Sequence, residues 1–317
     1  MKIREPYHEG EVRVQELAGE RDVALLTART IRDRVAVPAF RFLAMQRHLV
    51  LGRADGEHAC EATVLFGDPG FLRVEAEGKA LSIALEPERD RHLDPVLAAL
   101  AVGDRISGLA IELATRRRLR LNGRVRALDL ARLVLEVDES YQSCPKYIQK
   151  RVVEIDADFD SSTTRSEQTV SSGTALLEPQ RALVRAADTL FVVTVHPEGH
   201  ADASHRGGEP GFVHVDDDGA LSIPDYVGNS MFNTLGNITT NPRAALLFWD
   251  FDQKRLLHLA GRAELRFGVG DRELATGGTG RSWTFHTERW IEQRLSLPFR
   301  LRLVERSPFN PSPTTRS

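Results

Sequence analysis

An internal repeat constrains the fold of this chain more than any other feature of its sequence. The segment GDPGFLRVEAEGKALSI at residues 67–83 returns as GEPGFVHVDDDGALSI at residues 208–223. Further pairs keep the same order and nearly the same spacing: residues 55–62 with 198–204, 103–113 with 241–251, and 119–125 with 257–263. Because several matches in one order are not expected by chance, the sequence predicts a duplicated domain.

Each copy is predicted to be mainly β with one inserted helix. Residues 47–54 and 190–197 are short apolar runs with β-branched residues, ended by turn residues, which is typical of strands. The repeated segment alternates in polarity on both sides of an acidic turn with glycine, which indicates a hairpin. A helix is expected after each hairpin, at residues 91–100 in the first copy and 229–238 in the second.

The strands of each copy favour a small closed structure over a parallel sheet. About six strands with regular turns fit a barrel, and closure leaves few exposed strand edges. Residues 156–175 are polar and rich in Ser and Thr, so they are predicted to form a linker. The predicted organisation is an N-terminal barrel at residues 1–155, the linker, a C-terminal barrel at 176–310 and a tail at 311–317.

Composition excludes several functional classes. The net charge of −3 does not favour nucleic-acid binding. The chain has no apolar run of the roughly 20 residues that a membrane span needs, and its first residues lack the apolar core of a signal peptide. Two cysteines and the spacing of the histidines suggest neither a disulfide framework nor a metal site. A cytoplasmic protein without nucleic-acid or membrane partners is expected.

The two copies differ at a place where the second could bind an anion. His205 and Arg206, followed by two glycines, stand where the first copy has the apolar Val64 and Leu65. A cation beside glycines suits an anionic group that approaches the backbone closely. A basic residue in an ordinary turn explains the same residues equally well.

A second difference follows the hairpin. Residues 228–230 of the second copy precede its predicted helix, and the N-terminus of a helix favours phosphate. The first copy has Glu86, Glu88 and Asp90 at the matching place, and their carboxylates would repel a phosphate. We therefore predict that only the second copy keeps a phosphate site.

Other conspicuous segments are interpreted as structural. The glycine-rich residues 275–282 lack the lysine and the spacing of a P-loop, so they are predicted to form a loop. The acidic residues 216–218 are interpreted as a solvated hairpin tip and not as a calcium loop. The basic residues 114–126 are interpreted as a solvated strand face.

Three segments of the second copy follow one another in a distinctive order: DASHRGGEPGFVHV at residues 202–215, NPRAALLF at 241–248 and GRAEL at 261–265. In these segments the chain resembles the FMN-binding split-barrel family typified by pyridoxamine 5′-phosphate oxidase. SYQSCPKYIQKR at residues 140–151 is similar to a segment of tandem, two-barrel members. The resemblance implies two tandem six-stranded split β-barrels with inserted helices, forming an internal pseudo-dimer with FMN in the groove between them.

The same resemblance implies which residues bind the flavin. The segment from Asp202 to Arg206 would lie along the ring, and Arg206 with residues 229–230 would hold the phosphate. The complete set that it implies is Asp202, Ala203, Ser204, His205, Arg206, Asp225, Tyr226, Asn229, Ser230 and Trp249. The first copy matches the family in skeleton only, so its own cofactor site is expected to be degenerate.

One departure from the family concerns the phosphate. The oxidase has a Ser-Arg-Lys cluster where this chain has residues 228–230, so two cations are missing. Lys146, Lys150 or Arg151 would have to supply the positive charge from the segment at residues 140–151.

The chemistry at the ring is less defined by the sequence. Tyr226, Phe232 and Trp249 are candidates to pack near the flavin or substrate, and barrel core is an equal alternative for each. No residue is assigned as a catalytic acid or base. His205 is the nearest candidate, and a hydrogen bond to phosphate or backbone is its favoured role.

The predicted function is that of an FMN-dependent oxidoreductase that takes electrons from a small-molecule donor such as NADH or NADPH. Residues 295–313 do not show the pyridoxine-phosphate-binding ending of the oxidase, so another substrate is expected. The alternative is a non-catalytic protein that binds flavin, deazaflavin or haem. A third possibility is a purely structural protein in which both grooves are empty. A homodimer is expected because split barrels usually bury a large face.

Overall fold

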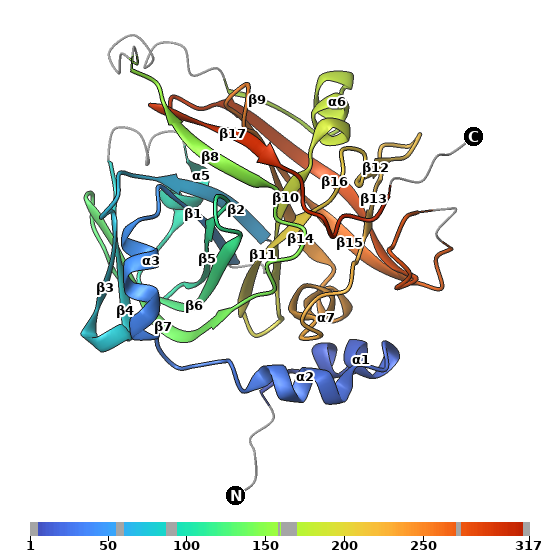
Figure 1. The fold of residues 1–317 in the computed structure, drawn as a ribbon, viewed down its shortest axis with the longest axis horizontal. Coiled ribbons are helices and arrows are strands. Elements are labelled where there is room, and N and C mark those ends of the chain that lie inside the picture. The colour runs from blue at the N-terminus through green and yellow to red at the C-terminus, as the bar shows by residue number, and fades with distance from the viewer. Residues whose placement is uncertain are drawn as a thin grey trace, which may run out of the picture.

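The computed structural model describes residues 6–54, 60–86, 94–157, 159, 170–270 and 274–312. Strands dominate this part of the chain, and its helices are few and short (Figure 1). The predicted mainly β class is therefore confirmed. None of the described helices is long and apolar enough to cross a membrane.

The first half of the chain folds into a seven-stranded sheet, which we call the first sheet. Its strands lie in the order β2-β1-β5-β6-β7-β4-β3, and every neighbouring pair is antiparallel. The strands are β1 (His48–Ala54), β2 (Cys60–Phe66), β3 (Leu72–Glu75), β4 (Ala80–Ala84), β5 (Arg105–Glu112), β6 (Arg117–Leu128) and β7 (Arg132–Gln142).

The second half forms an eight-stranded sheet, the second sheet, in the order β11-β10-β14-β15-β16-β13-β12, with β9 paired to β16. Its strands are β9 (Val170–Gly173), β10 (Thr189–Val195), β11 (Ala201–Gly207), β12 (His214–Val215), β13 (Leu221–Pro224), β14 (Arg243–Asp250), β15 (Arg255–Phe267) and β16 (Arg281–Arg294). Apart from β9, corresponding strands follow the same order in both sheets, which is the pattern that a duplicated domain produces.

Helices connect and cover the sheets. They are α1 (Glu9–Leu17), α2 (Arg21–Ala28), η1 (Val37–Ala39), α3 (Phe40–Ala44), η2 (Ala76–Gly78), α5 (Pro95–Ala99), α6 (Glu178–Ala186) and α7 (Asn233–Thr240). The carboxylate of Asp94 caps α5 by accepting hydrogen bonds from the amides of Val96 and Leu97. The helix expected at residues 229–238 begins only at Asn233, because Phe232 before it has a left-handed backbone with φ of 59°.

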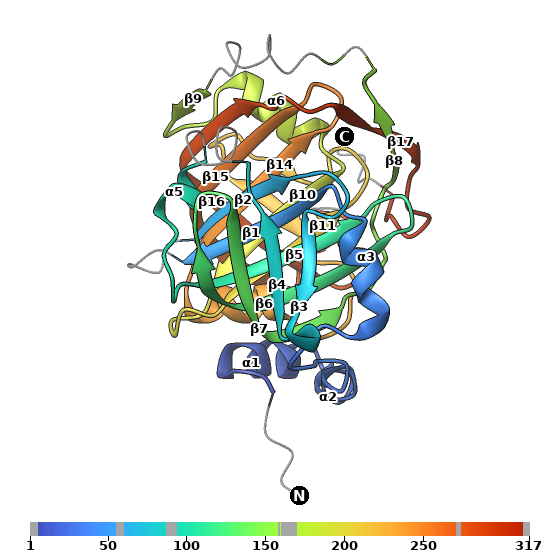
Figure 2. The same ribbon diagram turned by 90° about the vertical axis from the view of Figure 1, so that its left-hand side faces the viewer.

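The two sheets pack face to face and share an apolar core. Figure 2 looks onto the first sheet, with the yellow and orange strands of the second sheet crossing behind it. Each sheet has a core of its own, and a third apolar cluster includes Val50 and Leu109 from the first sheet with Phe191 and Leu247 from the second. Burial of this shared cluster joins the halves into one body.

Two strands outside the sheets strengthen the connection between the halves. β8 (Lys150–Ile155) follows the last strand of the first sheet, and β17 (Phe299–Glu305) follows the last strand of the second. They pair with each other as an antiparallel ribbon, visible at the upper edge of Figure 1. The extension of each half therefore finds its backbone partners in the other half.

Residues 6–28, which we call the N-terminal arm, pack against the second half. Helix α1 lies on α7 (Figure 1), and a Cβ atom added to Gly10 would lie 2.2 Å from the carbonyl oxygen of Gly236. The side chain of Gln15 donates to the carbonyl of Met231 over 3.0 Å. The N-terminal arm thus lies beside the loop that precedes α7.

Candidate cofactor cleft

A cleft lies between the two halves beside the N-terminal end of α7. The first half lines it with residues of β6 and of the segment after β7, namely Arg118, Arg120, Ser143, Lys146 and Tyr147. The second half contributes His205, Arg206, Gly207, Phe212, Pro224, Asp225, Tyr226, Gly228, Asn229, Ser230, Phe232, Asn233 and Thr234. Its lining is therefore shared between residues far apart in the sequence.

Two arginines of β6 were not predicted as part of any site. Leu119 and Leu121 point into the core of the first sheet, so Arg118 and Arg120 point to its other face. The second half covers that face, and Arg120 is only 5% exposed. The interpretation of this stretch as a solvated strand face is therefore wrong for these two arginines, although Arg117 is exposed.

Arg120 is the centre of a buried polar network across the two halves. Its guanidinium donates to Asp202 over 2.6 Å, to the side-chain oxygen of Asn233 over 2.8 Å, and to the hydroxyl of Ser204. The hydroxyl of Thr234 donates to the other oxygen of Asp202 over 3.2 Å. Asp202 and Ser204, predicted to lie along a flavin, hold Arg120 and are not among the residues that line the cleft.

Arg118 and Arg206 keep donors without partners. Both guanidinium groups reach the carbonyl of His205, over 3.1 Å and 3.3 Å. The Nε of each is buried and has no hydrogen-bond partner among the described residues. Burial and the guanidinium groups of Arg120 and Arg206 lower the pKa of Arg118 to about 9. Such crowded cations are stabilised by an anion.

His205 is buried between these cations. Burial, followed by the charges of Arg118 and Arg206, lowers the pKa of His205 well below its usual range. Its ring meets that of Phe191 edge-on at 5.8 Å between centroids. The imidazole is therefore neutral at neutral pH and does not act there as a cationic acid.

Three non-glycine residues at the cleft have a left-handed backbone. The φ angles are 64° at Tyr147, 61° at Ser230 and 59° at Phe232. Such conformations cost about 1–2 kcal/mol each and are common at ligand sites. Tyr147 and Tyr226 face each other with ring centroids 4.9 Å apart, and the hydroxyl of Tyr147 donates to the carbonyl of Val227 over 3.2 Å.

Only some of the residues predicted to hold a phosphate line the cleft. Asn229 and Ser230 line the cleft, but the hydroxyl of Ser230 donates to Glu20 of the N-terminal arm over 2.5 Å. Of the three cations proposed to compensate, Lys146 lines the cleft. Arg151 is instead buried in an ion pair with Asp188, at 2.9 Å.

Of the other residues predicted to bind the flavin, some line the cleft and some do not. Asp225 and Tyr226 line the cleft, and Asp225 lies 3.8 Å from Arg206 and 3.1 Å from Arg281. Ala203 does not line it, and its amide donates to Ser107 of the first sheet over 2.9 Å. Trp249 does not line it either, because its ring packs in the shared apolar cluster.

The corresponding position in the first copy is a smaller and more apolar pocket. Leu109 pairs with Arg120 in the first sheet, as Leu247 pairs with His258 in the second, so His258 takes the place of Arg120. Burial lowers the pKa of His258 to about 4, which leaves it uncharged. Of the acidic residues predicted to repel phosphate there, Glu88 and Asp90 lie outside the described residues.

Comparison with known proteins finds a family model that matches most of the second copy of the repeat. Residues 176–282 match the family model of pyridoxamine 5′-phosphate oxidase. The matched segment includes β10 to β15, α7 and the cleft residues of the second half.

Several solved structures are similar to part of the chain. HupZ of Group A Streptococcus is 19% identical, with a TM-score of 0.30, over 36% of this chain and 91% of that chain. A candidate pyridoxamine 5′-phosphate oxidase of Lactobacillus delbrueckii is 16% identical, with a TM-score of 0.30, over 37% and 93%. An FAD-binding protein of Mesorhizobium loti is 11% identical, with a TM-score of 0.28, over 40% and 99%. No curated protein matches the chain.

Proposed function

We propose that this chain is an FMN-dependent oxidoreductase in which two tandem split barrels, one for each sheet, hold the flavin in the cleft between them. The observation that carries this proposal is the pair of buried Nε donors, at Arg118 and Arg206, that find no hydrogen-bond partner in the part of the chain that the structure describes. The family match of residues 176–282 supports a flavin as the ligand.

The charge of the cleft fits a phosphate monoester. Four cationic side chains line it, at Arg118, Arg120, Lys146 and Arg206, and Asp225 is the acidic side chain of the lining. Asp202 behind Arg120 neutralises a second positive charge. The surplus of two positive charges matches the nearly doubly charged phosphate of FMN at pH 7.

The protein's own groups would bind and position the cofactor. Arg118, Arg206 and Lys146 would hold the phosphate, because guanidinium groups bind it through paired donors and an ammonium acts as a point charge. The Tyr147 and Tyr226 rings would exclude water from one side of the cleft. Bound FMN would supply two-electron transfer from a donor such as NADH or NADPH to a small-molecule substrate.

The first test is whether the protein retains FMN. Purified protein is mixed with excess FMN and desalted, and we expect absorption bands near about 370 and 450 nm that bleach anaerobically with NADH or NADPH and return in air. Arg206→Glu should abolish retention because it places a negative charge beside the phosphate. Arg117→Glu is the matched control, since it makes the same charge change at a strand arginine of the first sheet that is exposed and does not line the cleft.

Each other outcome excludes a part of the proposal. If the wild type retains no flavin, the flavin site is wrong, and a band near about 400 nm would indicate haem. If flavin is retained but neither nucleotide reduces it, the non-catalytic binding protein is the better description. A homodimer and a cytoplasmic location stay predictions from the sequence.

A further inference from the structure

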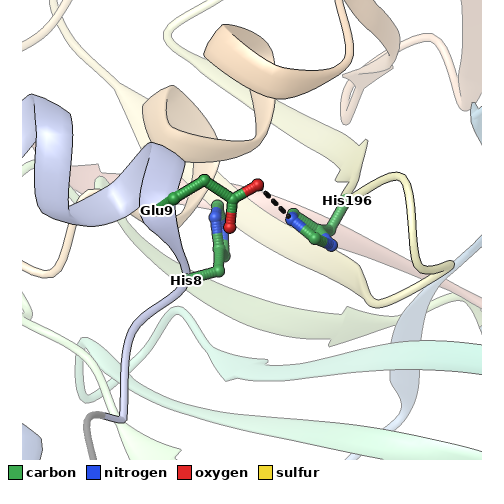
Figure 3. Close-up of side chains that lie close together, drawn as sticks. All are labelled: His8, Glu9 and His196. Carbon is green, nitrogen blue, oxygen red and sulfur yellow. Dashed lines mark hydrogen bonds and ion pairs between the residues drawn. The ribbon is translucent and has the colours of Figure 1, made fainter.

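A cluster of three side chains that could bind a metal ion lies outside the cleft, where the N-terminal arm meets the second sheet (Figure 3). His8 and Glu9 stand at the start of α1, and His196 follows the end of β10. One potential ligand atom from each residue lies within 4.8 Å of the others. The two imidazole rings are 4.4 Å apart, and His196 Nε2 is 3.2 Å from Glu9 Oε1.

The backbone holds both histidines in place. His8 is the N-cap of α1, and its Nδ1 accepts a hydrogen bond from the amide of Gly10 over 3.1 Å. His196 Nδ1 accepts one from the amide of Glu198 over 3.2 Å. His196 is buried, whereas the Glu9 side chain is 72% exposed. Before an ion binds, the cluster is therefore held on its inner side and open to solvent at the carboxylate.

We propose that His8, Glu9 and His196 form a binding site for a divalent transition-metal ion, with zinc as the best match. Two imidazoles and a carboxylate are a ligand set that zinc takes, with a fourth position left for water, whereas magnesium and calcium prefer oxygen alone. Zinc bonds of about 2.0–2.2 Å require the ligand atoms to be closer than the present limit of 4.8 Å. The exposed Glu9 carboxylate can approach by a change of its side-chain conformation, and the two imidazoles must also draw together.

Metal binding moves the ring protons of the histidines and replaces their hydrogen bonds from backbone amides. In the metal-free protein His196 carries its proton on Nε2, because Nδ1 accepts the amide hydrogen bond. An ion on Nε2 displaces this proton to Nδ1, which then no longer accepts the hydrogen bond from Glu198. At His8, either nitrogen can bind the ion only when the hydrogen bond from Gly10 is released. Two amide hydrogen bonds are thus exchanged for metal bonds.

Such a site would connect the N-terminal arm to the second sheet. His8 and Glu9 belong to the N-terminal arm, whose Glu20 contacts Ser230 over 2.5 Å and Arg281 over 2.8 Å at the cleft. An ion held jointly with His196 would tie the arm to the second sheet. The proposal does not depend on which cofactor the cleft binds.

Metal titration of the untagged full-length protein tests the site. After dialysis against EDTA, we expect one zinc ion per chain by calorimetry, a rise in melting temperature with zinc, and visible absorption of tetrahedral type with cobalt. His196→Asn keeps an acceptor for the Glu198 amide, and His8→Ser keeps a favourable N-cap. Each should lower zinc affinity by at least about 10-fold, as losing part of a metal site typically does.

Two further variants of this protein complete the test. Glu9→Gln alters an exposed side chain, so it should preserve the fold while weakening zinc binding. His286→Asn changes an exposed histidine far from the cluster in sequence and should bind zinc like the wild type. The proposal is overturned if the wild type binds neither metal, or if all three cluster variants keep wild-type affinity.

Discussion

The guanidinium of Arg120 and the carboxylate of Asp202 form a buried ion pair at 2.6 Å that joins the two halves of the chain. Arg120 belongs to β6 of the first sheet and Asp202 to β11 of the second, and their side chains are 6% and 5% exposed. In the other half of the repeat His258 and Glu61 take these places, and Glu61 pairs with Arg53 instead. The repeat has therefore become asymmetric at its centre.

Replacing Arg120 with Met should destabilise the protein strongly. The substitution leaves Asp202 buried without its charge partner, and breaking a buried pair in this way typically costs about 3–5 kcal/mol. Urea unfolding would measure the change. The double variant Arg120→Met/Asp202→Leu should recover most of the loss, because neither partner is left as an unpaired buried charge. A loss in the double variant as large as in the single one would contradict this account.

The asymmetry of the two pockets predicts one flavin per chain. The pocket that corresponds to the cleft is smaller, and an uncharged His258 replaces Arg120 there. We expect absorbance of the desalted, saturated protein to give a stoichiometry of one FMN per chain. Two flavins per chain would mean that the first copy has kept its site. The prediction rests on the proposed function.

Gly10→Ala should loosen the N-terminal arm. A Cβ atom there would lie 2.2 Å from the carbonyl oxygen of Gly236, although alanine itself favours a helix. We expect a loss of about 1–3 kcal/mol from overpacking, together with faster proteolysis of the arm. Gly270→Ala is the control, because among the described residues no atom beyond its chain neighbours lies within 4 Å of its added Cβ. Equal behaviour of the two variants would show that the arm does not need this close contact.

Gly207→Ala should impair the cleft without reaching the ligand directly. The added Cβ would lie 2.1 Å from the carbonyl oxygen of Tyr147, so the segment carrying Tyr147 and Lys146 must move. We expect FMN affinity to fall by at least about 10-fold, which corresponds to one lost charge-assisted hydrogen bond. Gly228→Ala also changes the lining, but its nearest neighbour is 3.9 Å away, so it should bind FMN normally. Fluorescence titration would compare the two, and unchanged binding in Gly207→Ala would contradict the prediction.

Acid should weaken the fold through His258. Burial lowers its pKa from 6.5 to about 4, so the unfolded chain binds the proton more readily than the folded one. The stability contribution of the neutral ring is complete above pH 6.5 and is lost as the pH falls toward 4. The loss is about 2.5 kcal/mol between pH 7 and 4.5.

Urea unfolding at these two pH values tests this titration. His258→Gln should lose less stability than the wild type over the interval, by roughly the amount assigned to the ring. His286→Gln, which alters an exposed histidine, should follow the wild type. If His258→Gln has the same pH dependence as the wild type, another group is responsible.

The strand-rich fold could be predicted because its signals are local. Alternating polarity and turn glycines in residues 67–83 and 208–223 specify hairpins wherever they occur. The boundary of α7 could not be predicted in the same way. Residues 229–232 have no signal that excludes a helix, and the left-handed backbone at Ser230 and Phe232 appears only where the N-terminal arm packs on this loop.

Part of the cleft was accessible from the sequence and part was not. His205 and Arg206 stood out because apolar residues replace them in the other copy. Arg118 and Arg120 did not, because the same alternation describes a strand face covered by water or by a second sheet. Their burial depends on the docking of β11 and its neighbours against β6. A network such as that of Arg120 with Asp202 leaves no trace in local spacing.

The sequence by itself determined the repeat, the strand-rich class and the place where the second copy acquired a basic pair. These are properties of neighbouring residues, whose periodicity and turn chemistry act over a few positions. Only the tertiary structure decided that Arg118 and Arg120 complete the cleft, that Glu20 meets Ser230, and that His8 meets His196. These contacts join residues that are far apart in the chain, and apolar burial between the sheets and along α7 brings them together.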